Sequence, residues 1–216
     1  MTDAPTSPTP VGGWTDPEQV GWYVERIGKL EARQAGERMF AEVMPPAPKR
    51  VLDLGCGDGR LAALTLDERP SVEAVVAVDS SPPMVDLARA RFAGDPRVEV
   101  RTGDLNDSIS TLGTFDLIVS GFAIHHLDDA RKQQLFREIA TQLNSGGAFV
   151  NLEVVASATP QRHADFLVAI GRTADDPEDR LATIEHQLAW MHDAGLTNVD
   201  CLWRWRGFAL LVGEAA

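Results

Sequence analysis

The sequence predicts an α/β fold with a doubly wound, mostly parallel sheet, and three observations support this. Short apolar segments alternate with helical segments between residues 50 and 154, an order typical of parallel sheets. A glycine-rich loop separates the first apolar segment from the first helix that follows it. Two last apolar segments meet around Gly207, and so short a connection permits only an antiparallel pair.

Runs of apolar residues mark the expected strands, and apolar residues at helical spacing mark the expected helices. We expect parallel strands at 50–54, 75–78, 98–101, 115–120 and 148–154. We expect helices before or between them at 17–30, 32–43, 60–67, 82–92 and 129–143. Right-handed crossovers then place helices on both faces of the sheet.

The C-terminal part follows a different pattern. Its expected elements are a helix at 181–194 and strands at 198–206 and 208–213. The connection 159–180 is longer than usual for an α/β protein. It contains His163, Phe166 and Arg172, and we leave open whether it contacts a substrate or is a plain surface helix.

The length of 216 residues suits one domain. We expect a disordered tail at 1–13 and one domain at 14–216. Within it, we expect an N-terminal helical cap at 14–45, a ligand-binding core at 50–154, a cover segment at 155–180 and a helix with the terminal hairpin at 181–216.

The net charge of −12 argues against nucleic acid or an anionic membrane as partner. No cationic leader and no apolar run long enough for a membrane span is present, so we expect a cytoplasmic protein. Cys56 and Cys201 show no paired spacing, and the histidines and acids lack the spacing of metal ligands, so no metal is expected. A homodimer is left open.

The glycine loop that begins after Leu54 is the sharpest signal in the chain. Gly55, Gly57 and Gly59 allow a ligand to approach the backbone closely, next to the free N–H groups of a helix N-terminus. The second strand ends at Asp79, where a carboxylate can accept hydrogen bonds from both hydroxyls of a ribose. Loop and acid together indicate an adenosine ligand.

The details of the loop favour one kind of adenosine ligand. A dinucleotide site has a third glycine where this chain has Arg60, and the lysine of a nucleoside triphosphate loop is absent. Asp53, just before the loop, would repel a pyrophosphate but suit an ammonium and a sulfonium group. Residues 53–59 thus resemble the first motif of class I S-adenosylmethionine-dependent methyltransferases.

The resemblance extends from about residue 50 to residue 154 and implies a Rossmann-like, seven-stranded sheet whose last strand is antiparallel. It implies that Gly55, Cys56 and Gly57 border the methionyl part and that Asp79 holds the ribose. The other residues that it places around the cofactor are Ser80, Met84, Asp104, Leu105 and Ser120, with Asp104 on the adenine amino group. The N-terminal helices would add Tyr23 and Arg26 at the methionyl end.

Three of the residues in these motifs also have structural explanations. Met84 lies on the apolar stripe of its helix and suits a core position. Asp104 could cap a turn through Asn106. Asp116 belongs to the segment 115–120, which resembles the fourth-strand motif of the family, but it could simply begin a strand. The sequence leaves both roles open for each of them.

His125 and His126 follow the fourth strand at its carboxyl end, where ligands bind in such sheets. An imidazole titrates near neutral pH, so either is a candidate general base for an acceptor that must lose a proton. The alternative is that one packs beneath the cofactor and the other beside the next helix.

The first strand of the terminal hairpin ends in Trp203, Arg204, Trp205 and Arg206. Alternation places the tryptophans on one face and the arginines on the other. These residues could hold an aromatic or anionic substrate, or the tryptophans are core and the arginines solvated.

The predicted function is therefore methyl transfer from S-adenosylmethionine to an O, N or C nucleophile of a small molecule. An NAD-dependent oxidoreductase is the rival enzyme class, and Arg60 and Asp53 argue against it. A non-catalytic protein that binds S-adenosylmethionine is the other alternative.

Overall fold

The computed structural model describes residues 13–216. The predicted tail lies outside the described residues, except that Gly13 begins the short helix η1 (Gly13–Thr15). Seven strands form one sheet in the order β3-β2-β1-β4-β5-β7-β6. Their bounds are β1 (Arg50–Leu54), β2 (Ala74–Asp79), β3 (Val98–Thr102), β4 (Phe115–Gly121), β5 (Leu143–Val154), β6 (Thr197–Trp205) and β7 (Phe208–Glu214).

Strand directions agree with the doubly wound prediction. The pairs β3–β2, β2–β1, β1–β4 and β4–β5 are parallel. Strand β7 runs antiparallel to both β5 and β6, which makes β6 parallel to the first five strands. The carboxyl ends of β1 to β6 therefore meet at one edge of the sheet, where ligands bind in folds of this kind.

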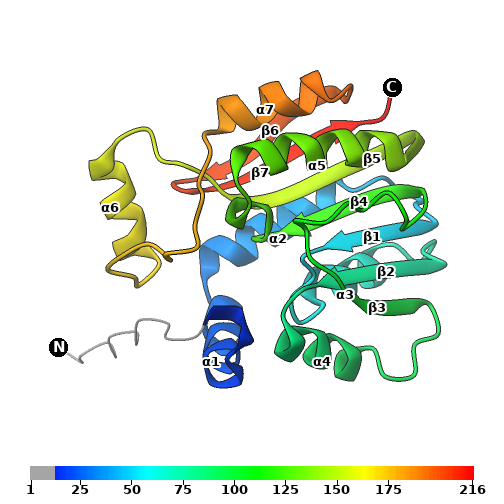
Figure 1. Ribbon diagram of the computed structural model, residues 1–216, viewed down its shortest axis with the longest axis horizontal. Coiled ribbons are helices and arrows are strands. Elements are labelled where there is room, and N and C mark those ends of the chain that lie inside the picture. The colour runs from blue at the N-terminus through cyan, green and yellow to red at the C-terminus, as the bar shows by residue number, and fades with distance from the viewer. Residues whose placement is uncertain (1–12) are drawn as a thin grey trace.

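Helices cover both faces of the sheet, as Figure 1 shows. The helices are α1 (Pro17–Ile27), α2 (Glu31–Val43), α3 (Arg60–Glu68), α4 (Pro82–Arg91), α5 (Asp129–Gln142), α6 (Pro160–Ala169) and α7 (Ile184–Asp193), with a short η2 (Ile124–His126) after β4. Side chains of α5 and α7 share one buried cluster with Leu52 and Ile118. Side chains of α2 and α3 share another with Val51 and Leu117, the alternate residues of the same strands.

Several boundaries differ from the predicted ones by a few residues, and at two of them hydrogen bonds give the reason. Strand β5 begins at Leu143 and continues through the Gly146-Gly147 pair, because the carbonyl of Gly147 accepts from Ala215 and keeps this part in the sheet. Helix α7 begins at Ile184 because the Thr183 side chain accepts a hydrogen bond from the backbone N–H of His186 and caps it.

Three segments lie together beyond the carboxyl edge of the parallel strands. They are α1, α6 and the connection between α6 and α7, all on the side toward which β1, β2 and β4 point (Figure 1). Two backbone hydrogen bonds fix the start and the end of this covering part of the chain. The Val155 N–H donates to the Gly207 carbonyl at 2.8 Å, and the Ala156 N–H donates to the Ala182 carbonyl at 2.9 Å. These segments therefore cover the carboxyl edge of the sheet, at which the glycine loop lies.

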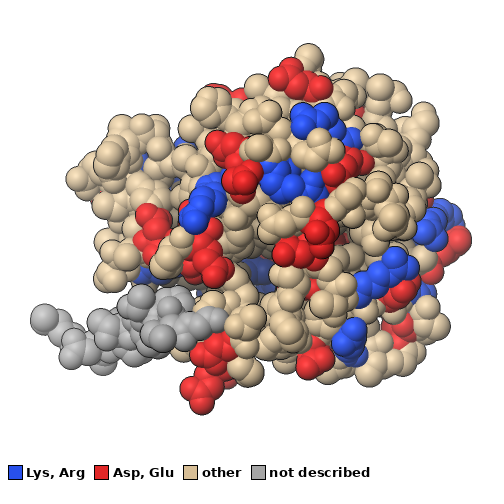
Figure 2. Space-filling model, viewed as in Figure 1, with Lys and Arg blue, Asp and Glu red and all other residues tan. Residues whose placement is uncertain are grey.

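The surface charges are interspersed on the face that Figure 2 shows, where basic side chains lie beside acidic ones. Ion pairs at the surface of the protein include Arg97–Asp95 and Arg101–Glu99. Within residues 13–216, none of the helices has the length and apolar character that a bilayer crossing requires.

Candidate functional site: two cavities that share a wall

The glycine loop turns sharply between β1 and α3. Gly55, Gly57 and Gly59 have φ angles of +66°, +55° and +82°, a region that side chains rarely allow. A Cβ on Gly55 would also lie 2.2 Å from the Cβ of Ala123 in the loop after β4. The loop therefore needs glycine at this position for both conformation and space.

Asp79 fixes the loop from the end of β2. Its Oδ2 accepts a hydrogen bond of 2.8 Å from the Gly57 N–H, and its Oδ1 accepts one of 2.8 Å from the Ser81 N–H. Burial raises the pKa of this carboxyl, although the backbone hydrogen bonds act in the opposite direction. The acid thus links the two loops that line the cavity next to it.

A first cavity of about 500 Å³ opens along these loops. Its lining includes many of the residues that the sequence assigned to the cofactor: Tyr23, Gly55, Cys56, Gly57, Asp79, Ser80, Met84, Asp104 and Leu105. Asp104 lines the cavity, and its Oδ1 accepts a hydrogen bond from the backbone N–H of Asn106, so its role in the turn is present and its contact with the adenine stays a prediction. Burial raises the pKa of the Cys56 thiol, which therefore stays protonated.

Three of the predicted cofactor contacts are not in this lining, so these placements need correction. Asp53 points away, and its Oδ2 accepts from the Ala62 N–H at 3.1 Å near the start of α3. Ser120 is fully buried and donates to the Leu54 carbonyl at 2.8 Å. Arg26 stacks over the Trp22 ring and lines a different cavity.

The first cavity has further residues that the sequence did not assign to it. Arg33 and Arg60 both lie in its lining and both pair with Glu37. Trp14 also lines the cavity, and its carbonyl accepts a hydrogen bond from the Ser81 hydroxyl. Arg60 follows the loop directly and could have been noticed, whereas Arg33 and Trp14 come from segments with no recognisable motif.

A second cavity, of about 730 Å³, adjoins the first. Its aromatic and aliphatic lining comes from α1, α6, the loop after β4 and the start of β7, and includes Trp22, Phe166, Leu167 and Phe208. Trp14, Tyr23, Ile27, Phe122 and His126 line both cavities. These shared residues make the two cavities immediate neighbours.

The histidine pair lies at this wall on η2. His126 lines both cavities and His125 lines the second. The Nδ1 of His125 lies 2.6 Å from Oε1 of the fully buried Glu153. Burial, reinforced by the neighbouring His125, lowers the pKa of His126 to about 4, so that His126 is neutral at pH 7.

The terminal hairpin does not reach either cavity, which corrects the substrate prediction. The predicted alternation is present, with the tryptophans half-buried and the arginines exposed. Trp203 packs against α2 at Gly36, and Trp205 lies beside Phe166 and Phe208. The β6 strand ends at the expected edge, but β4, β5 and β7 separate it from β1, which the glycine loop follows.

Comparison with known proteins supports the class that this geometry defines, an α/β protein with an adenosine-type site at the carboxyl edge. Residues 51–147 match the model of a methyltransferase domain. An uncharacterized methyltransferase of Mycobacterium tuberculosis is 34% identical over 124 residues, which are 57% of this chain and 58% of that protein. The chain thus spans less than two thirds of this relative's length.

Solved structures show the same fold. An O-methyltransferase family protein from Burkholderia thailandensis aligns over 87% of this chain and 57% of its own, with a TM-score of 0.69 and 22% identity. Human N-acetylserotonin methyltransferase in complex with S-adenosylmethionine aligns over 94% of this chain and 57% of its own, with a TM-score of 0.70 and 15% identity.

Residues 51–147 therefore form a methyltransferase domain, which confirms the resemblance to S-adenosylmethionine-dependent methyltransferases seen in the sequence. The cofactor of this class is S-adenosylmethionine, and the first cavity fits it chemically. Asp79 offers a carboxylate for ribose hydroxyls, and the loop at Gly55 and Gly57 presents backbone without side chains. Arg33 and Arg60 offer positive charge for the carboxylate of the methionyl group.

Proposed function

We propose that this protein transfers the methyl group of S-adenosylmethionine to an O, N or C nucleophile of a small molecule bound in the second cavity. The observation that carries the proposal is the wall of five residues, Trp14, Tyr23, Ile27, Phe122 and His126, common to both cavities. Methyl transfer is an in-line displacement, so the protein must chiefly place two molecules end to end. Such orientation is worth roughly 7–11 kcal/mol of the barrier.

The lining of the second cavity indicates the class of acceptor. A volume of about 730 Å³ suits a small organic molecule. Aromatic side chains from Trp22, Phe166 and Phe208 favour a planar, mainly apolar acceptor. The acidic residues of the lining, among them Asp175 and Asp176, disfavour an anionic one, so we propose an aromatic acceptor with a hydroxyl or amino nucleophile.

The supporting elements have separate tasks. S-adenosylmethionine supplies an activated methyl group when it is bound. Trp14 is held by a hydrogen bond from Ser81 and by a ring contact with Tyr23 at 4.9 Å between centroids, and we propose that it helps to exclude water. His125 and His126 line the second cavity, and we propose that they take part in the loss of the acceptor's proton.

An acceptor screen tests this proposal. The purified protein, incubated with S-adenosylmethionine and a set of aromatic alcohols and amines, should release the demethylated cofactor with at least one of them. S-adenosylmethionine should raise the melting temperature, because a ligand that binds the native state shifts unfolding, and NAD should not. A larger shift with NAD would support an oxidoreductase, and tight cofactor binding without any acceptor would support a non-catalytic binding protein.

A further inference from the structure

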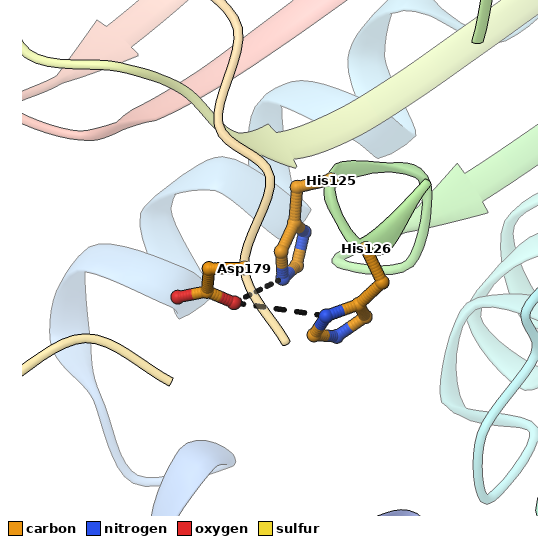
Figure 3. Close-up of side chains that lie close together, drawn as sticks. All are labelled: His125, His126 and Asp179. Carbon is orange, nitrogen blue, oxygen red and sulfur yellow. Dashed lines mark ion pairs between the residues drawn. The ribbon is translucent and has the colours of Figure 1, made fainter. Parts of the chain in front are cut away.

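Two histidines and one carboxylate converge at the wall of the second cavity. His125 and His126 project from η2, and Asp179 reaches them from the connection between α6 and α7, as Figure 3 shows. One ligand atom from each residue lies within 4.8 Å of the other two. Among residues 13–216, this is the one group of histidine, cysteine and acidic residues with such a geometry.

Two distances in this cluster, both to the Asp179 carboxylate, are too long for hydrogen bonds and suit a coordination shell. Oδ1 of Asp179 lies 3.4 Å from Nε2 of His125 and 3.6 Å from Nδ1 of His126. A charge-assisted hydrogen bond would be about 2.7–2.9 Å. A tetrahedral ion with bonds of about 2.0–2.1 Å separates its ligand atoms by about 3.4 Å.

Each histidine is oriented by a second partner, as in metal sites where the outer ring nitrogen donates to a carboxylate or a backbone carbonyl. Nδ1 of His125 lies 2.6 Å from Glu153, which turns Nε2 of His125 toward Asp179. The ring of His126 hydrogen-bonds to the backbone of Glu178, while its buried Nδ1 has no hydrogen-bond partner.

The backbone also holds the carboxylate in place. The Arg180 N–H donates to the His125 carbonyl at 2.8 Å, and the Arg180 carbonyl accepts from the fully buried Lys132. The Asp179 N–H donates to the carbonyl of Asp176 at 3.0 Å. The three ligand side chains therefore belong to two segments that are locked to each other without any ion.

We propose that His125, His126 and Asp179 bind one divalent transition-metal ion, of the zinc type. Two neutral imidazoles and one carboxylate are a known set of protein ligands for such ions, and they leave coordination positions open. The acids Glu153 and Asp176 lie around the cluster and offset the remaining positive charge. The competing arrangement is a direct contact of His125 with both Glu153 and Asp179, which needs no ion.

The open positions face the second cavity, because His125, His126 and Asp179 all line it. An acceptor hydroxyl that reached the ion there would lose its proton more easily, since a bound cation stabilises the oxyanion. This assignment of a role rests on the proposed methyl transfer, whereas the binding of the ion itself does not.

Metal binding to untagged protein, freed of ions with a chelator, tests the site. We expect saturable, one-to-one binding of Zn²⁺ by calorimetry, and visible absorption bands of a nitrogen- and oxygen-ligated ion with Co²⁺. His126→Gln and Asp179→Asn should weaken binding at least 10-fold, and Glu153→Gln about 10–100-fold. His163→Gln is the matched control. His163 lies on α6, and its Nε2 is 2.7 Å from Oδ1 of Asp175, but this pair lacks a second imidazole.

Circular dichroism and S-adenosylmethionine binding, measured on the same variants, show whether each is folded. Absence of saturable Zn²⁺ binding, or equal binding by wild type, His126→Gln and Asp179→Asn, would overturn the site. Methyl transfer that proceeds unchanged in the chelator would overturn the role of the ion and leave the proposed function intact. Loss of transfer in the chelator, with cofactor affinity retained and activity restored by Zn²⁺, supports both.

Discussion

The two cavities are built from different parts of the chain. The first is lined mainly by loops at the strand ends, such as Gly55 to Gly57 and Asp79 to Ser81, close to one another along the sheet. The second takes its lining from α1, α6 and the connection around Asp179, which are distant in sequence and lie beyond the sheet (Figure 1). The first cavity therefore depends mainly on the sheet and its loops, and the second depends on the segments that cover the sheet.

This difference separates what is shared by a class from what is particular to one protein. Backbone geometry at the carboxyl edge follows from the sheet, so any chain with this loop presents a similar first cavity. The covering segments can change without disturbing the sheet, and they decide which acceptor fits. Changes in the two regions should therefore have separable effects on cofactor and acceptor.

The largest effect should come from Asp79→Ala in the first cavity. The change removes a carboxylate expected to accept from two ribose hydroxyls, at about 1.5–3 kcal/mol for each hydrogen bond. We expect the affinity for S-adenosylmethionine to fall roughly 100-fold or more by calorimetry. Asp86→Ala, at an exposed carboxylate on α4, is the control.

Asp79 also accepts from the N–H groups of Gly57 and Ser81, so the melting curve must show that the variant is folded. Asp79→Asn keeps the shape and one acceptor, and it should lie between wild type and Asp79→Ala. Normal cofactor affinity in a folded Asp79→Ala variant would contradict the ribose contact.

The second cavity should respond to Phe166→Ala without a change in the first. Phe166 is buried on α6 and its ring packs against Phe208 at 5.2 Å and against the backbone at Gly207. Removing a buried phenylalanine costs about 3–5 kcal/mol, so we expect lower stability and a higher KM for the acceptor. Cofactor affinity should stay within about twofold of wild type.

Val168→Ala on the same helix is the control, because Val168 is 75% exposed. An equal loss of cofactor and acceptor affinity in Phe166→Ala would mean that the two cavities are not independent.

The sequence predicted the sheet and the first cavity well for a physical reason. Strands and the glycine loop are set by local patterns, and their residues come together through the sheet itself, as Gly57 and Asp79 do. Asp179 meets His125 only through the path of a long connection, and no local spacing reveals that contact. This is why the sequence predicted no metal site at the histidine pair.

Asp53 shows a different limit of prediction from sequence. Its place before the glycine loop was predicted, but the side of the strand that its side chain faces was not. The strand residue before the glycine loop could face either side, and hydrogen bonding to the Ala62 N–H decides it. Its other oxygen, Oδ1, is buried without a hydrogen-bond partner. An interior position of this kind should affect stability rather than ligand recognition.

Asp53→Asn should change how stability depends on pH. Burial raises the pKa of Asp53 to about 7, against about 3.9 in an unfolded chain. The native state therefore binds more protons between these values, and its stability falls as pH rises through that range. Asparagine has no such proton, so the variant should lack this fall.

Urea unfolding at about pH 5 and about pH 8 measures the difference, at about 1.4 kcal/mol for each unit of pKa separation. The lowered pKa of His126 acts in the opposite direction in acid, so the comparison is between Asp53→Asn and wild type at each pH. Asp86→Asn is the exposed control. Identical pH profiles for Asp53→Asn and wild type would contradict the raised pKa.

The smallest effect should come from the arginines of the terminal hairpin. Arg204 and Arg206 are exposed, Arg204 donates to the Arg206 carbonyl at 3.2 Å, and neither lines a cavity. Arg204→Lys and Arg206→Lys should leave kcat and the KM for the acceptor unchanged, and the free energy of unfolding within about 0.5 kcal/mol of wild type.

Arg172→Lys is the matched comparison, because Arg172 lines the second cavity and pairs with Asp176 at 3.9 Å. It should raise the KM for the acceptor, since lysine cannot reproduce the planar guanidinium. If instead a hairpin variant raised this KM and Arg172→Lys did not, the acceptor would reach the hairpin, and the second cavity would not be its binding site.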